Sequence, residues 1–378
     1  MNERWLVSVD DYRKVARRRL PHMIFDYLEG GALDETTTRA NKTDLDRRLL
    51  RQRNFVDLTD MTTQTTVLGQ KIEMPLMVSP MGMLTMFNPA SDIAVAKAAA
   101  DAGSIYVHSA WAGCSIEDVL EVGGERVWAQ VAFWKDDAES AAYVDRLEAC
   151  GINTLVIAGD VNSSSKRERD MRHGLSMPPR PPALDYIRTG TRPRWIWGWR
   201  TGRPMSYGNY SIEGRPMKMR EMNDWMAKNK NRSATWEDVR KLRSRWPGKL
   251  VLKGVMDADD AKLAADAGVD AVYVSNHGGR QFDAQRSAIA VLPSVAEAVG
   301  ERVEIYMDGG ICRGHDIVKA MACGADAVFA GRTFAYALAA GGERAVTKTF
   351  AILQEELVGA MGFAGVTAPS QIDRSVLA

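Results

Sequence analysis

The chain has 378 residues, 46% hydrophobic and 26% charged, which fits a soluble globular protein with room for one large barrel or two ordinary domains. A formal net charge of +1 excludes a general electrostatic attraction to nucleic acid or to acidic partners. The four cysteines have neither metal-ligand nor disulfide-framework spacing, so we expect a reducing cytoplasm, no disulfide and no metal.

The N-terminal part of the chain predicts helices followed by irregular structure. Residues 1–4 lead into no apolar stretch, so no signal peptide is expected. Residues 8–31 predict two helical pieces separated by Pro21, with Ser8 and Asp11 resembling a capping box at the start. The polar residues 32–70 predict irregular structure that ends in a hairpin near 65–72.

From residue 73 onward, apolar strands alternate with helical segments. Helical patterns cover 92–103, 138–151, 258–268, 288–299 and 315–324, and an amphipathic helix over 343–362 closes the series. Eight apolar runs, typical of strands buried on both faces, are 74–79, 105–109, 127–133, 154–160, 249–254, 271–276, 304–309 and 327–332. Strict alternation favours an α/β fold of the (β/α)8 TIM-barrel type over a doubly wound sheet. We expect residues 1–378 to form this one domain, with an N-terminal helical extension.

One long insertion, residues 161–235, follows the fourth predicted strand. Between 180 and 220 it holds nine Arg or Lys residues against Asp185 and Glu213, with Trp195, Trp197 and Trp199 among them. Basic residues interleaved with tryptophan are typical of a segment on an anionic membrane surface, here the inner face. An active-site lid with a solvated basic face is the preferred alternative. No nucleic-acid-binding module surrounds the patch.

Polar side chains follow the ends of successive strands, where TIM barrels carry their chemistry. His277 can exchange a proton near neutral pH, and Arg280 offers a planar fork for a carboxylate. The glycine-rich ends at 308–310 and 331–332 are typical of a phosphate site. Although a strand-end residue such as Asp160 is often only a helix cap, the whole set predicts a phosphorylated cofactor, an anionic substrate and a histidine base.

Residues 275–281, Ser-Asn-His-Gly-Gly-Arg-Gln, closely resemble the signature of the FMN-dependent α-hydroxy acid dehydrogenases and oxidases. This family includes glycolate oxidase, lactate oxidase and the flavin-dependent lactate and mandelate dehydrogenases. The resemblance runs nearly end to end, and residues 10–14 and 26–32 look particularly like mandelate dehydrogenase. It implies FMN as the cofactor, oxidation of a 2-hydroxy acid to a 2-keto acid, and a homotetramer. The electron acceptor stays open between O2, a quinone and another carrier.

The resemblance also implies roles for individual residues. His277 would be the active-site base and Asp160 would stabilise its charged form, while Lys253 would stabilise the negative charge of reduced FMN. The substrate and its carboxylate would contact Arg280, Arg167, Tyr27 and Trp111. The remaining cofactor contacts would come from Pro80, Met81, Gly82, Ser109, Gln130, Asp308, Gly309, Gly310, Arg313, Gly331 and Arg332.

Several positions depart from the family pattern. Ala132 stands where a tyrosine is usual, which removes a hydroxyl and opens volume for a bulky or aromatic substrate. Ala158, Cys312 and Met81 replace residues that usually contact the cofactor. Gly82 replaces the alanine frequent in oxidases and so favours a dehydrogenase. The altered pocket leaves open an alternative, FMN-dependent oxidation of an amino or peptide-derived substrate. The intact set of catalytic residues argues against a non-catalytic scaffold.

Overall fold

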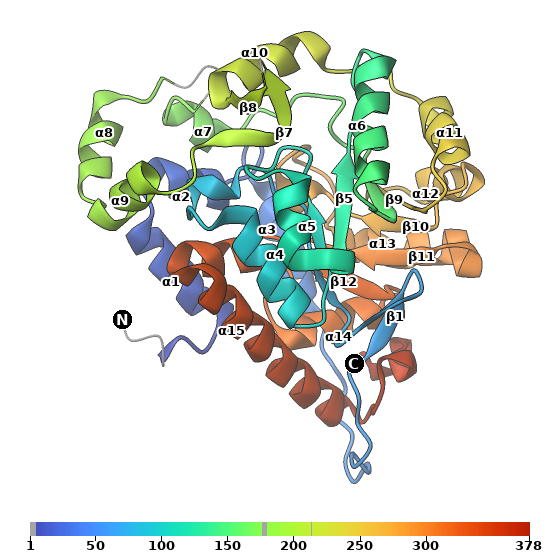
Figure 1. The fold of residues 1–378 in the computed structure, drawn as a ribbon. Coiled ribbons are helices and arrows are strands. Elements are labelled where there is room, and N and C mark those ends of the chain that lie inside the picture. Colours follow the sequence, from blue (N-terminus) through green and yellow to red (C-terminus); the bar gives the residue numbers. More distant parts are fainter. Residues whose placement is uncertain (1–4, 176–179, 213) are drawn as a thin grey trace.

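A closed barrel of eight parallel strands forms the centre of the computed structural model, which describes residues 5–175, 180–212 and 214–378 (Figure 1). The predicted TIM barrel is therefore confirmed, and every predicted strand is present. Its strands, in chain order, are β3 (Leu76–Val78), β4 (Tyr106–His108), β5 (Val127–Val131), β6 (Thr154–Ala158), β9 (Lys249–Val255), β10 (Ala271–Val274), β11 (Glu304–Met307) and β12 (Ala327–Ala330).

Helices surround the barrel, six of them at the predicted places, while the helices over 116–123 and 236–245 had not been predicted. They are α4 (Ser91–Asp101), α5 (Ile116–Gly123), α6 (Asp137–Ala149), α11 (Trp236–Arg245), α12 (Ala258–Asp266), α13 (Ala288–Val299), α14 (Gly314–Ala322) and α15 (Arg332–Ala364). The predicted helix 343–362 is the second part of α15, which kinks because Gly341 and Gly342 have non-helical backbone angles. Figure 1 shows α15 running beside the N-terminal helix α1 (Val9–Arg19).

The N-terminal extension contains one helix more than predicted. Ser8 caps α1 by accepting from the Asp11 N–H, and α2 (His22–Glu29) follows Pro21, both as expected. Residues 32–70, predicted to be irregular, include the helix α3 (Thr36–Arg47), and that prediction was wrong. The sequence of α3 is polar and has no strong apolar period, so the pattern did not indicate a helix. The helix is stabilised instead by side-chain hydrogen bonds to the loop after β10, such as that from Asn41 to Asn276 at 2.8 Å.

Aromatic side chains fill the inside of the barrel. Trp128, Tyr273, Tyr306 and Phe329 are all buried there, and the rings of Tyr273 and Phe329 stack with centroids 4.4 Å apart. The predicted hairpin, β1 (Thr65–Val67) with β2 (Gln70–Ile72), is confirmed and buries Val67 and Ile72 against this cluster. The barrel is therefore a packed core, and the chemistry lies beyond the carboxyl ends of the strands.

The insertion between β6 and β9 is built from short helices and one hairpin. Its elements are α7 (Glu168–Arg172), α8 (Ala183–Gly190), α9 (Pro193–Thr201), β7 (Ser206–Ile212), β8 (Arg215–Lys218) and α10 (Met219–Asn229). Within the predicted lid 161–235, positions 176–179 and 213 lie outside the described residues, as do residues 1–4, on which the signal-peptide expectation rests. The Asn209 amide donates to the carbonyl oxygen of Ser109 and fastens β7 to the end of β4.

Candidate active site

His277 and Asp160 form a hydrogen-bonded pair at the ends of β10 and β6. Nδ1–H of His277 donates to Oδ2 of Asp160 at 3.0 Å, which leaves Nε2 as the proton acceptor of the ring. Burial opposes ionisation of Asp160, but the charges of His277 and Lys253 outweigh it and lower its pKa to about 2. Burial lowers the pKa of His277 below its ordinary value of 6.5, with Lys253 and Arg167 adding to the shift against the opposing effect of Asp160.

The backbone that carries His277 is in an uncommon conformation. His277 itself has a φ of +57°, and Gly278 and Gly279 follow at +63° and +75°. A Cβ on Gly279 would lie 2.5 Å from the backbone nitrogen of Thr38, so only glycine lets α3 come this close. The Thr38 hydroxyl donates to the carbonyl oxygens of both glycines and supports this turn. The left-handed backbone conformation of His277 raises the free energy of the folded state, and the packing of α3 against this turn offsets that increase.

Lys253 on β9 is a buried cation at the same edge of the barrel. Its Nζ donates to the Ser275 hydroxyl at 2.9 Å and lies 3.8 Å from Oδ2 of Asp308. That Asp308 oxygen also accepts from the Tyr273 hydroxyl at 2.8 Å, while Asp308 Oδ1 is buried without a described partner. A positive charge held in a region of low dielectric stabilises negative charge that develops beside it.

Arg280 and Arg167 place two positive charges next to His277. Arg280 stacks over the Tyr27 ring at 4.9 Å and donates to the carbonyl oxygens of Tyr27 and Gly30. Arg167 donates to the Arg280 carbonyl oxygen and to the Gln281 side chain. Within the described residues neither guanidinium forms an ion pair, and the charge of Arg280, together with burial, lowers the pKa of Arg167 to about 10. Two such cations form a site for an anion.

The ends of β3, β4 and β5 form the opposite side of the site. The Ser109 hydroxyl donates to Oε1 of Gln130 at 3.0 Å, as expected for neighbouring strand ends. The chain around Pro80, Met81 and Gly82 lies against Trp111, because a Cβ on Gly82 would come within 3.2 Å of that residue. The Trp111 ring meets Trp134 edge-on, and its buried Nε1 has no described partner.

The glycine-rich ends of β11 and β12, predicted to bind the cofactor phosphate, also allow other parts of the chain to pack closely against them. A Cβ on Gly310 would lie 2.7 Å from the carbonyl oxygen of Asn41, so close packing of α3 already requires glycine there. Gly309 has a φ of +100° beside the same residue. Gly331 precedes the N-terminus of α15, where backbone N–H groups favour a phosphate. The Arg332 guanidinium donates to the carbonyl oxygens of Leu28, Gly30 and Gly278.

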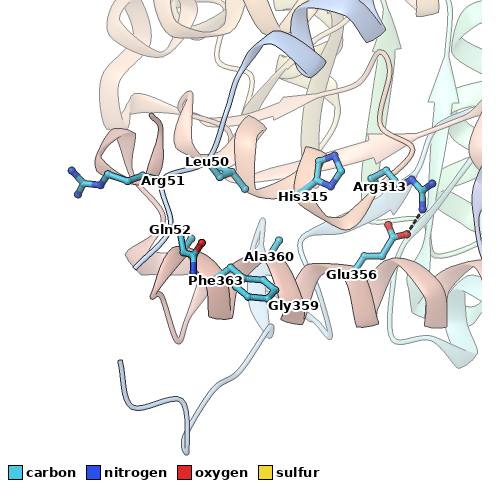
Figure 2. A pocket seen from close by; sticks show the side chains of 10 residues that line it. Leu50, Arg51, Gln52, Arg313, His315, Glu356, Gly359, Ala360 and Phe363 are labelled. Atoms are coloured by element: carbon cyan, nitrogen blue, oxygen red, sulfur yellow. Dashed lines mark hydrogen bonds and ion pairs between the residues drawn. The ribbon is translucent and has the colours of Figure 1, made fainter. Parts of the chain in front are cut away.

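Arg313 is not brought together with the other predicted residues. Its guanidinium pairs with Glu356 of α15 at 2.6 Å and lines a groove of about 650 Å³, with Leu50, His315 and Phe363 among its other walls (Figure 2). No other predicted site residue is among the described residues that line this groove. Burial raises the pKa of the Cys312 thiol to about 11, so its side chain is neutral near neutral pH.

Several residues that form the site were not assigned to it from sequence. Ser275 lies within the quoted motif but only the structure shows it joining Lys253 to the His277 N–H. Tyr273 looks like an ordinary apolar strand position, and its hydroxyl reaches Asp308 because strand residues alternate between the barrel interior and the helices. Asn41 had no sequence signal, since its helix was not predicted.

Gly254 is a further position that the site requires. Its φ is +102°, and a Cβ there would lie 2.8 Å from Cβ of Asp160. We expect Gly254→Ala to lower the free energy of unfolding by about 1–3 kcal/mol, through backbone strain, and to slow catalysis by displacing Asp160. Gly359→Ala is the control: an added Cβ there meets nothing within 4 Å, and a helical alanine stabilises by about 0.5–1 kcal/mol. Urea unfolding measures both, and equal stabilities would contradict the prediction.

This geometry defines a class of protein: an α/β-barrel enzyme with a partly buried histidine–carboxylate pair, a pair of arginines for an anion and a buried lysine at one end of the barrel. Residues 16–378 match the family model of the FMN-dependent dehydrogenases. The chain belongs to this family, and more specifically to its α-hydroxy acid dehydrogenases and oxidases, so it is an FMN-dependent enzyme that oxidises a 2-hydroxy acid.

The similar proteins cover nearly the whole chain. An L-lactate dehydrogenase of Pseudomonas syringae pv. syringae is 37% identical over 98% of both chains, and one of Caulobacter vibrioides is 36% identical over 98% of this chain and 97% of its own. Among solved structures, the monotopic membrane protein (S)-mandelate dehydrogenase is 33% identical with a TM-score of 0.93 and 99% coverage of both chains. Mandelate oxidase with (S)-4-hydroxymandelic acid is 34% identical with a TM-score of 0.85 and 98% coverage of both.

The residues present fit an anionic flavin cofactor. A buried ammonium on Lys253 and an unpartnered buried oxygen on Asp308 are polar groups that an FMN ring and its ribityl chain would satisfy. The N-terminus of α15 offers N–H groups for a phosphate. This fit does not depend on Cys312, a departure from the family pattern, or on Arg313, the predicted contact that pairs with Glu356 instead.

Proposed function

We propose that this chain oxidises a 2-hydroxy acid with a bulky or aromatic side chain, of the mandelate type, with His277 as the base and the two arginines holding the carboxylate. The observation that carries the reaction class is the arginine pair beside the His277–Asp160 pair, with Arg280 stacked over the Tyr27 ring. Ala132 supports the large substrate, because it is a small side chain directly after β5, and Trp134, two residues further on, packs against the predicted contact Trp111.

In the proposed reaction the substrate loses two electrons and two protons and becomes a 2-keto acid. Bound FMN supplies the two-electron acceptor for this chemistry. The free Nε2 of His277 takes a proton from the substrate, and the Asp160 carboxylate stabilises the imidazolium that forms. Arg280 and Arg167 orient the substrate through its carboxylate, assisted by the Tyr27 hydroxyl. Lys253 stabilises the negative charge that the cofactor gains.

Anaerobic mixing of the purified flavoprotein with a panel of 2-hydroxy acids, mandelate and lactate first, tests this proposal. Bleaching of the flavin by mandelate in preference to lactate is the expected result, and the rate of recolouring in air then separates an oxidase from a dehydrogenase. Bleaching by lactate alone would overturn the bulky-substrate proposal. Bleaching by an amine, with no hydroxy acid active, would favour the amino or peptide-derived substrate.

Replacing Ala132 by tyrosine should shift the substrate preference from mandelate toward lactate. The added ring occupies volume beside the substrate, so we expect the ratio of kcat/KM for mandelate over lactate to fall at least about tenfold. Steady-state kinetics with an artificial electron acceptor measures the ratio. The same fall for both acids would contradict the prediction, because it would indicate general damage to the site.

We propose further that α8 and α9 lie on an anionic membrane surface. Exposed apolar side chains alternate there with exposed arginines: Leu184, Tyr186, Ile187, Trp197 and Trp199 beside Arg188, Arg194 and Arg200. This combination binds the headgroup region of anionic bilayers, and one structural relative is a monotopic membrane protein. Among the described residues, no helix is both long enough and apolar enough to cross a membrane.

Flotation with vesicles of anionic or neutral lipid tests this surface. We expect binding to anionic vesicles at low salt, and loss of most binding in the double variant Ile187→Ser and Trp197→Ser. The control is Phe363→Ser, because Phe363 is 70% exposed, as is Ile187, yet lies far along the sequence on α15. Equal binding by all three proteins, or none by the native chain, would contradict the proposal.

The homotetramer implied by the family resemblance is also proposed for this chain. Exposed apolar side chains outside α8 and α9, Phe55 among them, offer surface for a second copy. Light scattering on the purified protein checks the mass, and a monomer at micromolar concentration would contradict it.

A further inference from the structure

Two histidines and one aspartate gather outside the active site, between α2 and the end of α7. Oδ2 of Asp26 lies 2.8 Å from Nε2 of His173 and 3.5 Å from Nδ1 of His22. The three ligand atoms all lie within 4.8 Å of one another. In a tetrahedral zinc site with bonds of about 2.1 Å, ligand atoms are about 3.4 Å apart, so small side-chain adjustments would bring all three into that geometry.

The surrounding groups orient two of these ligands. Nδ1 of His173 is 2.9 Å from Oδ2 of Asp185 on α8, an arrangement that fixes the ring tautomer and leaves Nε2 as the coordinating atom. The second oxygen of Asp26, Oδ1, lies 3.6 Å from the Arg169 guanidinium, so Oδ2 remains directed at the two histidines. A carboxylate behind a histidine is the usual second layer of a protein zinc site.

Charge and access also suit a divalent cation. Asp26, Asp185 and Glu35 contribute three carboxylates, whereas Arg169, which pairs with Glu35 at 2.6 Å, contributes one positive charge. The Asp185 side chain is only 5% exposed and that of His173 10%, but that of His22 is 49% exposed. One side of the cluster is therefore buried and the other is open to solvent. The open side lets the ion enter and leaves room for a water as fourth ligand.

We propose that His22, Asp26 and His173 bind one zinc ion. The expectation of no metal rested on cysteine spacing, which cannot detect ligands separated by 147 residues along the chain. Nitrogen and carboxylate ligands favour zinc over magnesium or calcium, which take oxygen ligands. The ion joins α2, which carries Tyr27, to α7 and, through Asp185, to α8. It thereby holds the insertion beside the substrate site and adds a structural element to the proposed function without taking part in the reaction.

Zinc titration of the chelator-treated flavoprotein, in competition with a chromogenic zinc chelator, tests the proposal. We expect one zinc per chain and a melting temperature that rises with zinc concentration, since the ion binds only the folded state. Magnesium at the same concentration should give neither effect. Cobalt in place of zinc should give the visible absorption of a tetrahedral ion, a readout independent of activity.

Three variants make the assignment specific. His22→Asn and His173→Asn should each abolish stoichiometric zinc binding, and because His22 is half exposed its replacement leaves the fold intact. Asp185→Asn should weaken binding about 10- to 100-fold, as loss of a second-layer carboxylate does. His315→Asn, a histidine 43% exposed in the groove of Figure 2, is the control and should bind as the native chain does. Absence of zinc binding by the native protein, or unchanged binding by His22→Asn and His173→Asn, would overturn the proposal.

Discussion

Replacement of His277 by asparagine is expected to slow flavin reduction by the 2-hydroxy acid about 10²–10⁴-fold, the contribution of a positioned base. Asparagine keeps a hydrogen-bond donor for Asp160 but has no group that accepts a proton near neutral pH. Because His277 is placed beside the substrate and is not assigned to FMN binding, the variant should stay yellow and should still bind the 2-keto acid. Stopped-flow reduction under anaerobic conditions measures the effect.

The pH dependence gives the same prediction an independent check. Only neutral His277 accepts a proton, and burial lowers its pKa, so kcat/KM should rise with pH through a pKa below 6.5 and then become level. Asp160→Asn removes the carboxylate that favours the imidazolium, so the acid limb should move to still lower pH while the rate itself falls. His315→Asn serves as the control histidine. A reduction rate unchanged in His277→Asn would rule out His277 as the base.

Replacement of Arg280 by methionine should remove most of the recognition of the substrate carboxylate. Losing one side of a buried, charge-assisted contact costs about 2–5 kcal/mol, which is about 30- to 5,000-fold in kcat/KM. The charge of Arg280 is the main cause of the lowered pKa of Arg167, so that pKa should rise in the variant and Arg167 should remain as the single cation. The loss should therefore be large but incomplete, and the double variant with Arg167→Met should be weaker still.

The methyl ester of the same hydroxy acid separates recognition of the carboxylate from general damage. Native enzyme should prefer the acid strongly over its ester, whereas Arg280→Met should show little preference. Arg172→Met is the matched control, because Arg172 is a 70% exposed arginine on α7 that pairs with Glu168. If Arg280→Met retained the native preference for the acid, the carboxylate would be bound elsewhere.

The barrel could be predicted from the sequence because its signals are local. Apolar runs of strand length recur with helical segments between them, and each strand's polar end falls at the same edge of the sheet. The motif at 275–281 placed His277 and Arg280 on that edge, and the structure brings Asp160, Lys253 and Arg167 to them. Local pattern thus determined the fold, a phosphorylated cofactor and the charged residues of the site, and the family resemblance identified that cofactor as FMN.

The support beneath those residues could not be predicted, because it depends on contacts between distant segments. Helix α3 has no strong apolar period, and it is stable through Thr38 and Asn41, which contact the His277 loop. Gly254 looks like any strand-end glycine until Asp160 is seen against its Cα. His22 and His173 are unremarkable in the sequence and meet only when the insertion folds onto α2.

The sequence by itself therefore determined the barrel through its short-range hydrophobic period, and the resemblance of residues 275–281 to a family signature indicated the flavin and the reaction class. Only the tertiary structure decided that Asp160 packs against Gly254 and that contacts with the loop after β10 stabilise α3. It also directs Arg313 toward Glu356, away from the predicted cofactor contacts. Those features arise from close approaches between segments that lie 43 to 235 residues apart along the chain, and such approaches are specified by the packing of the interior.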